Sequence, residues 1–355
     1  MSGPHIYGQS TQVIDVESLT TGDFVFDSLN AAFNKEWNDT TKIKLLNEIS
    51  WHLTPIDVDK SIVFADSAIK LSEKSDWKIG KADALNNKGE ALRNKGSFDE
   101  ALKQHKLALE IFLELSDSKG EAKTESNIGI IYFNLSDFSQ SFKHFDNALD
   151  IYQILKNQDG ILNVYGYIGV VFSNFKQHEK AIEYFEKALQ IAEKMNNNSK
   201  IATQFNNLGL TFVEMKEYSK AITYYEKALN EFKKINEEFN YSITLGNIGI
   251  PYMELKNYSM ARKSFEESLA MAVKLGDQYG VAHQYGNIGE LYLKMEGDYY
   301  LKVNEGHETD YLNEAIRYLK LSINEFNSLG AIEDQKDYLI ILSDAYALNG
   351  NYKSS

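Results

Sequence analysis

Apolar residues recur at helical spacing along most of the chain, and the whole pattern repeats every 40 residues. The period is clearest at one position, or slot, of the pattern, which is glycine in six consecutive repeats. The residues in this slot are Gly89, Gly129, Gly169, Gly209, Gly249 and Gly289. A period of this length that is held without slippage predicts an array of stacked repeats and not a single closed fold.

Each repeat is predicted to be a pair of antiparallel helices joined by a short turn. The first helix carries the glycine slot, and the second begins near an aromatic residue or a histidine. Small residues inside the second helix allow neighbouring helices to approach closely. Such a hairpin cannot bury its apolar face alone, so stacking of the repeats is expected to form the core. The second helices are expected to begin near Phe98, Phe138, His178, Tyr218 and Tyr258.

The ends of the predicted helices carry signals of their own. Ser97 and Asp137 are followed three residues later by Glu100 and Gln140, which predicts capping boxes at the starts of two second helices. Glycine also recurs between repeats, where the chain must stop and reverse. Because glycine adopts the left-handed conformation freely, we expect that conformation at these positions. They are Gly80, Gly120, Gly160 and Gly280.

The period also predicts the domain organisation. Residues 1–39 are expected to form an N-terminal segment with one short helix, and residues 40–355 an array of about seven repeats. The first repeat is degenerate, and one repeat carries a long insertion at 296–311. A final single helix is predicted at 337–348, and Pro251 predicts a kink because it removes an amide donor inside a first helix.

Composition and charge exclude several classes of partner. The content of 43% hydrophobic and 25% charged residues is that of an ordinary soluble protein. Lys+Arg 37 against Asp+Glu 51 gives a net charge of -14, which repels phosphate backbones and anionic lipid surfaces. We therefore expect neither nucleic acid binding nor membrane insertion. The first ten residues lack the pattern of a signal peptide, which predicts a cytoplasmic protein; a periplasmic location is expected only if a native leader has been removed.

Catalytic chemistry finds no support in the sequence. There is no cysteine, and the seven histidines are scattered without metal-ligand spacing. No glycine-rich phosphate loop and no nucleophile elbow occur. His307 and Glu308 form the single local acid–base pair, which we interpret as part of a solvated loop. We expect no enzymatic activity, no cofactor and no metal site.

Several slots that recur together resemble the tetratricopeptide repeat (TPR). They are the glycine of the first helix, the aromatic residue three positions later, the aromatic start of the second helix and its core alanines. The 40-residue period is similar to that of Pins-type regulators and kinesin light chains, and the stretch 38–51 resembles the start of bacterial sensor arrays. The resemblance implies an all-α fold, a right-handed superhelical solenoid of antiparallel helical hairpins. It also implies that the first helices line a concave groove.

The first helices carry a ladder of asparagines along this expected groove. A side-chain amide both donates and accepts hydrogen bonds, so it can bind the backbone of an extended peptide of any sequence. In related arrays asparagines are used in this way. Acidic residues beside the ladder favour a ligand that carries Lys or Arg. The expected peptide-binding residues are Asn87, Asn127, Tyr167, Asn207, Asn247 and Asn287, a second line of Asn94, Asn134 and Asn174, and the acids Glu90 and Glu290.

Two questions stay open at this point. The other explanation for each asparagine is a bond to the neighbouring helix that serves the stack. The function expected first is a non-catalytic scaffold that holds a protein or peptide segment in the groove. The alternative is the ligand-sensing TPR portion of a longer bacterial signalling protein, such as a kinase, a cyclase or a transcription regulator. Self-association is expected if the last helix caps the array poorly.

Overall fold

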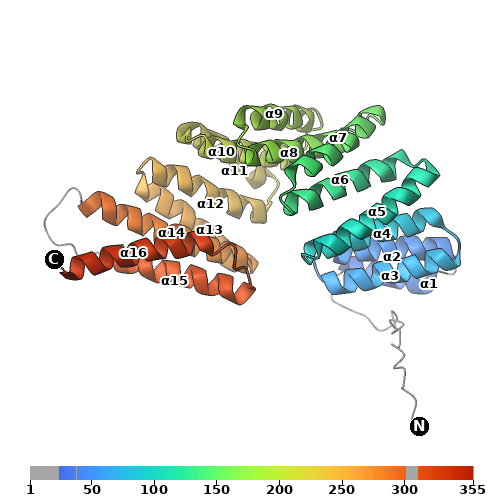
Figure 1. Ribbon diagram of the computed structural model, residues 1–355, viewed down its shortest axis with the longest axis horizontal. Coiled ribbons are helices and arrows are strands. Elements are labelled where there is room, and N and C mark those ends of the chain that lie inside the picture. Colours follow the sequence, from blue (N-terminus) through green and yellow to red (C-terminus); the bar gives the residue numbers. More distant parts are fainter. Residues whose placement is uncertain (1–23, 37, 301–310, 355) are drawn as a thin grey trace, which may run out of the picture. The chain divides into compact units, whose positions relative to one another are not determined.

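All regular elements of the described chain are α-helices. The structure, a computed structural model, describes residues 24–36, 38–300 and 311–354. The prediction of an all-α array of helical hairpins in tandem is confirmed (Figure 1). The helices are α1 (Phe24–Lys35), α2 (Asp39–Leu53), α3 (Val58–Lys74), α4 (Lys78–Asn94), α5 (Phe98–Leu115), α6 (Ser118–Asn134), α7 (Phe138–Ile154), α8 (Gln158–Asn174), α9 (His178–Lys194), α10 (Asn198–Glu214), α11 (Tyr218–Lys234), α12 (Glu238–Glu254), α13 (Tyr258–Leu275), α14 (Gln278–Tyr300), α15 (Tyr311–Leu329) and α16 (Lys336–Ser354).

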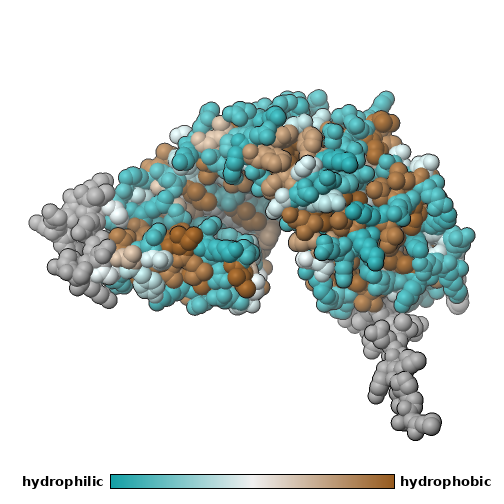
Figure 2. Space-filling model, in the orientation of Figure 1, coloured by the Kyte–Doolittle hydropathy of each residue, from teal (hydrophilic) through white to brown (hydrophobic). Residues whose placement is uncertain are grey.

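The chain forms two compact units, Met1–Tyr167 and Ile168–Ser355. In unit 1 each helix packs on the next, and the first helices of successive repeats also touch, α2 with α4 and α4 with α6. Unit 2 repeats this arrangement with α10, α12, α14 and α16 as its first helices. Figure 2 shows hydrophilic residues over much of the visible face of each unit, with patches of hydrophobic residues among them.

The glycine slot of the first helix lies against a ring of the second helix in the same hairpin. A Cβ atom on Gly129 would lie 2.8 Å from Cδ1 of Phe145, and one on Gly209 would lie 2.7 Å from Cδ1 of Tyr225. Both rings are almost completely buried. Glycine is therefore explained by close packing of the two helices.

The second helices α5, α7, α9, α11 and α13 begin at the residues expected from the period. The helix caps agree only in part with the capping boxes predicted from the sequence. Oδ1 of Asp137 accepts a hydrogen bond from the amide of Gln140 at 3.1 Å, as predicted. The prediction for Ser97 is wrong, because its side chain makes no capping hydrogen bond. Ser97 contributes only its backbone carbonyl, which accepts from the amide of Ala101 at 3.0 Å.

The expectation of left-handed glycines between the repeats is also wrong. Gly160 lies in the first turn of α8, where a Cβ would lie 2.5 Å from Cδ1 of Tyr152. The left-handed residue is Lys156, four positions earlier, with a φ of 53°. Neighbouring rings leave no room for a Cβ at Gly80, Gly120 and Gly160, and the Asp277 carboxylate leaves none at Gly280, whereas the turns place other residues at positive φ. Among the described residues these are the glycines Gly96, Gly276 and Gly330 and the non-glycine residues Asp76, Ser116, Ser136, Lys156, Lys176, Asn196, Lys216, Asn236 and Lys256.

Some sequence expectations fall partly outside the described residues. The insertion predicted at 296–311 begins inside α14, and its residues 301–310 lie outside the described ranges, as do His307 and Glu308. Residues 1–23 of the predicted N-terminal segment also lie outside them. Pro251 lies inside α12, which extends from Glu238 to Glu254.

Candidate functional site

The asparagine slot is the position two residues before the repeated glycine of each first helix. At the start of unit 1, asparagines in this slot hold consecutive repeats together. Asn87 is only 6% exposed, and its Nδ2 donates to the backbone carbonyl of Asn47 at 2.9 Å. Asn47 occupies the same slot one period earlier and donates from Nδ2 to the carbonyl of Gly80 at 3.2 Å. The sequence-based prediction omitted Asn47, although stepping back 40 residues from Asn87 finds it. These two amides join consecutive repeats.

Two asparagines of the slot differ from this arrangement. Asn127 on α6 and Asn207 on α10 are half-buried. Within the described part of the chain, neither side-chain amide has a hydrogen-bond partner. Because an amide carries two donors and an acceptor, each of these side chains can bind a group from outside the chain.

The remaining asparagines of the slot, both in unit 2, bind other side chains. Nδ2 of Asn247 donates to Oδ1 of Asn206 at 3.2 Å. Nδ2 of Asn287 donates to Oε1 of Gln284 at 3.3 Å, and its Oδ1 accepts from the hydroxyl of Tyr338 at 3.3 Å. The asparagine in this slot therefore has a hydrogen-bonded side-chain amide in some repeats and an amide without a partner in others.

The second predicted line of asparagines lies at the helix ends. Asn94, Asn134 and Asn174 are the last residues of α4, α6 and α8, and all three are exposed. Nδ2 of Asn174 donates to the carbonyl of Val170 in its own helix at 3.0 Å. Asn94 lines a hollow that is described below.

Tyr167 takes the asparagine slot of α8 and remains 40% exposed. Its ring stacks on that of Phe145, with 5.2 Å between the centroids and 7° between the planes. Burial raises the pKa of Tyr167, the charge of Glu90 raises it further, and the charge of Arg93 lowers it. These two charges act on the Tyr167 hydroxyl from α4, so all three residues belong to one face of unit 1.

The acidic residues of the predicted site already have cationic partners in the chain. Oε1 of Glu90 lies 2.6 Å from Nη2 of Arg93. In unit 2, Nζ of Lys294 lies 2.6 Å from Glu254 and 3.4 Å from Glu290. Burial raises the pKa of Glu290, and Lys294 opposes that shift. The acid excess expected on this face is thus partly neutralised within the chain.

A hollow of about 620 Å³ lies between α1, α2 and α4 of unit 1. It brings together two predicted site residues, Glu90 and Asn94, with two residues that the sequence-based prediction omitted, Glu48 and Trp51. The signal available in the sequence was a tryptophan on the first helix of the degenerate repeat. The lining residues are Val25, Leu29, Glu48, Trp51, His52, Thr54, Pro55, Glu90 and Asn94.

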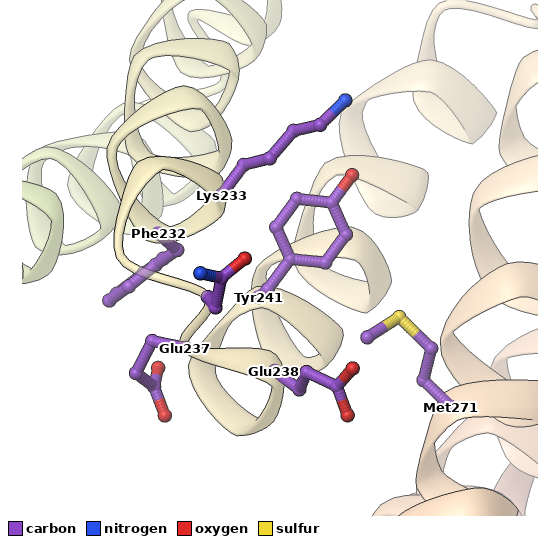
Figure 3. A pocket seen from close by; sticks show the side chains of 7 residues that line it. Phe232, Lys233, Glu237, Glu238, Tyr241 and Met271 are labelled. Atoms are coloured by element: carbon purple, nitrogen blue, oxygen red, sulfur yellow. The ribbon is translucent and has the colours of Figure 1, made fainter.

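Unit 2 has a smaller hollow of about 240 Å³ at the turn between α11 and α12, with Met271 of α13 on its far side (Figure 3). Its lining contains none of the predicted site residues. One of its acids, Glu238, already pairs with Lys274 at 2.7 Å. We therefore place the candidate site on the first helices of unit 1.

His105 has a structural role. It is completely buried, and its Nδ1 lies 2.8 Å from Oδ1 of Asn86. Nδ2 of Asn86 in turn donates to Oγ1 of Thr124 at 2.7 Å, so the three residues tie α4, α5 and α6 together. Burial lowers the pKa of His105 to about 4, which makes it neutral at pH 7. No group of three or more His, Asp or Glu side chains in the described ranges is placed to hold a metal ion.

Comparison with solved structures supports the helical array. A Rap protein complexed with Competence and Sporulation Factor is 16% identical over 92% of this chain and 97% of that chain, with a TM-score of 0.56. NprR in complex with its cognate peptide NprX is 18% identical over 90% of this chain and 92% of that chain, with a TM-score of 0.53. A STAND signal-transduction ATPase with a tetratricopeptide repeat sensor from Pyrococcus horikoshii is 16% identical over 90% of this chain and 50% of that chain, with a TM-score of 0.61. At these identities the similarity shows the fold alone.

The family follows from the sequence itself. No curated protein matches the chain. None of the helices in the described ranges has the length and apolar content needed to cross a membrane.

The profile of the tetratricopeptide repeat matches residues 80–153, 120–194, 161–234 and 200–272, which together cover more than half of the sequence. With its 40-residue helical hairpins and their glycine–ring contacts, the chain belongs to the tetratricopeptide repeat family.

Proposed function

We propose that this TPR array is a non-catalytic scaffold that binds a peptide or protein segment along the first helices of unit 1. The observation that carries the proposal is the half-buried amide of Asn127, which has no partner in the described chain. Its helix, α6, comes between α4 and α8 in the series of first helices. α4 supplies the Glu90–Arg93 pair, and α8 supplies the exposed ring of Tyr167.

The chemistry of this face suits an extended segment. The Asn127 amide can accept from a backbone N–H and donate to a backbone carbonyl of the ligand. The hydroxyl of Tyr167 offers a further hydrogen bond, and its ring offers apolar area. Two similar solved structures hold a bound partner, Competence and Sporulation Factor on a Rap protein and the cognate peptide NprX on NprR. They support a peptide as the class of ligand.

The asparagine ladder enters this proposal in a reduced form. Asn127 contacts the ligand, because its amide is free. The free amide of Asn207 belongs to unit 2 and lies outside the proposed site. Asn87, Asn247 and Asn287 chiefly hold the stack, because their amides already bind groups of the chain.

The test uses random linear peptides displayed on phage and selected on the wild-type protein. A selected peptide is then synthesised with a fluorescent label, and its affinity is measured by fluorescence anisotropy. We expect Asn127→Ala to weaken binding about tenfold, as for loss of hydrogen bonds to a buried backbone. The matched control is Asn147→Ala, which removes an exposed amide from the second helix α7.

Asn147→Ala is expected to leave the affinity unchanged. A folded Asn127→Ala protein that binds the selected peptide as tightly as wild type would contradict the proposed site. Peptide binding altogether would be contradicted if no selected peptide binds in such a way that its unlabelled form displaces its labelled form. Circular dichroism of each variant establishes that it is folded.

A second candidate function is ligand sensing within a longer signalling protein. It is favoured by the similarity to the STAND protein, of whose chain the array covers 50% and whose name includes a tetratricopeptide repeat sensor. The test is the gene sequence on both sides of the segment that encodes this chain. A kinase, cyclase or DNA-binding domain in the same reading frame supports this function, and stop codons at both ends exclude it.

A further inference from the structure

The hollow between α1, α2 and α4 combines an aromatic ring with an unpaired carboxylate. Trp51 is 53% exposed although it lines the hollow. Glu48 lies one turn earlier on the same helix and is exposed, and no cation among the described residues pairs with it. Glu90 on the α4 side is already paired with Arg93. The free negative charge of the hollow therefore comes from Glu48.

The remaining walls are apolar. Val25 and Leu29 of α1 face the hollow from one side, and Pro55 lines it beyond the end of α2. Apolar walls of this kind bind the methylene chain of Lys or Arg while the charged head reaches a polar group. A volume of about 620 Å³ lies within the range of small-ligand sites, so a long side chain and the adjoining backbone fit.

The Trp51 ring already attracts a cation from the chain itself. Nζ of Lys123, on α6, lies 5.1 Å from the centroid of the Trp51 ring. This distance is within the range at which the ring quadrupole attracts an ammonium group. Lys123 is exposed and forms no ion pair in the described part of the chain. A free ligand cation can therefore compete with Lys123 for this ring.

We propose that the hollow binds a lysine or arginine side chain of the bound segment. The carboxylate of Glu48 accepts hydrogen bonds from the cationic head, and the indole of Trp51 covers the side chain. Charge complementarity selects this occupant over an acidic side chain, and the unpaired carboxylate selects it over a purely apolar one. The proposal rests on the proposed function, since it assigns one side chain of the ligand to one place on the same face.

The experiment uses acetylated and amidated pentapeptides that differ only at the central residue, flanked by alanines. The central residue is Arg, Lys, citrulline, norleucine or Glu. The protein carries 5-fluorotryptophan, and Trp51→Phe assigns the fluorine resonance of Trp51. We expect the Arg and Lys peptides to shift that resonance saturably, with dissociation constants on the order of 1 mM.

Citrulline has nearly the shape of arginine without its charge, and norleucine lacks the amine of lysine. Both peptides are expected to bind about tenfold more weakly than their charged counterparts. The Arg peptide is likewise expected to bind Glu48→Gln about tenfold more weakly than it binds the wild-type protein. The matched control is Glu110→Gln, which removes an exposed carboxylate from the second helix α5. It is expected to leave binding of the Arg peptide unchanged.

The proposal is overturned if citrulline binds as well as arginine, if Glu48→Gln has no effect, or if no pentapeptide shifts Trp51. A second spectrum separates this failure from failure of the proposed function. The phage-selected peptide is added, and the side-chain amide of Asn127 is followed in a ¹⁵N spectrum. If that amide moves while Trp51 does not, the cationic subsite is wrong and the peptide-binding face stands; if neither moves, both are wrong.

Discussion

The side-chain amide of Asn87 donates a hydrogen bond of 2.9 Å to the backbone carbonyl of Asn47, which occupies the same slot of the preceding repeat. One repeat later, the amide of Asn127 has no partner in the described chain. The same position of the repeat therefore holds a bonded amide in one repeat and an amide without a partner in the next. This difference can be measured, because the two residues share a residue type and a helix position.

Asn87→Ala is expected to lower the free energy of unfolding by about 0.5–1.5 kcal/mol, because it removes a buried hydrogen bond between two repeats. Asn127→Ala is expected to change it by less than about 0.5 kcal/mol. Both substitutions gain the same helix propensity, so the difference between them isolates the bond. Urea unfolding followed by circular dichroism measures both values, and equal losses would refute the structural role of Asn87.

Gly209→Ala is expected to destabilise the protein by about 1–3 kcal/mol, although alanine is the better helix former. The new Cβ would lie 2.7 Å from Cδ1 of the buried Tyr225 ring, so the hairpin must open. Gly297, inside α14, is the control, because a Cβ added there would have no neighbouring atom within 4 Å. Gly297→Ala should stabilise by up to about 1 kcal/mol in the same thermal unfolding measurement. Stabilisation by both substitutions would be contrary evidence for tight packing.

The stability of unit 1 should fall as the pH drops from 7 to 5, in part because of His105. Burial lowers its pKa from 6.5 to about 4, so in this range the unfolded chain binds a proton that the folded chain excludes. This group alone should cost about 2 kcal/mol between pH 7 and pH 5, and the contribution is fully present only above the unfolded pKa.

The matched variant is His105→Phe, since Phe145 and Phe185 occupy the same slot in later repeats. Comparing urea unfolding of both proteins at pH 7 and pH 5 cancels the other titrating groups. The variant should lose about 2 kcal/mol less than wild type over this interval. An identical pH dependence would mean that His105 is solvated in the native state.

Lys123→Ala is expected to tighten binding of the arginine pentapeptide about threefold, because it removes a competing cation from the Trp51 ring. Fluorine titration at Trp51 measures the change. Lys103→Ala removes an exposed charge from α5 and is the control for the change in net charge. Weaker binding to Lys123→Ala than to Lys103→Ala would show that Lys123 holds the ligand and does not compete with it.

The repeat architecture could be predicted from the sequence because its determinants are local and recur. The starts of α5 and α7 at Phe98 and Phe138 follow from one period of 40 residues. The role of Gly129 follows from the same period, since a bulky residue of the second helix must lie against it. A sequence signal that is weak in one repeat becomes reliable when it recurs at the same position of several repeats.

The remaining features depend on how neighbouring helices meet. The period predicts a left-handed turn at Gly160, but this residue accommodates the ring of Tyr152, and Lys156 takes the left-handed position. The acceptor of Asn87 is a backbone carbonyl of another repeat, which no side-chain pattern reveals. Glu48 and Trp51 belong to a degenerate repeat, and the next repeat carries other residue types at the equivalent positions, Lys88 and Ala91. Their hollow forms because α1 packs on α2 and α2 packs on α4.

The glycine–ring contact also determines which parts of this chain are interchangeable. Gly209 and Tyr225 lie on different helices of one hairpin, and the missing Cβ of one provides the space for the other. The two positions should therefore co-vary, with a larger first residue tolerated only beside a smaller second one. In the α14–α15 hairpin the glycine is kept at Gly289 while the ring is replaced by Leu319. Recombination between repeats should succeed when it moves whole hairpins and fail when it separates their halves.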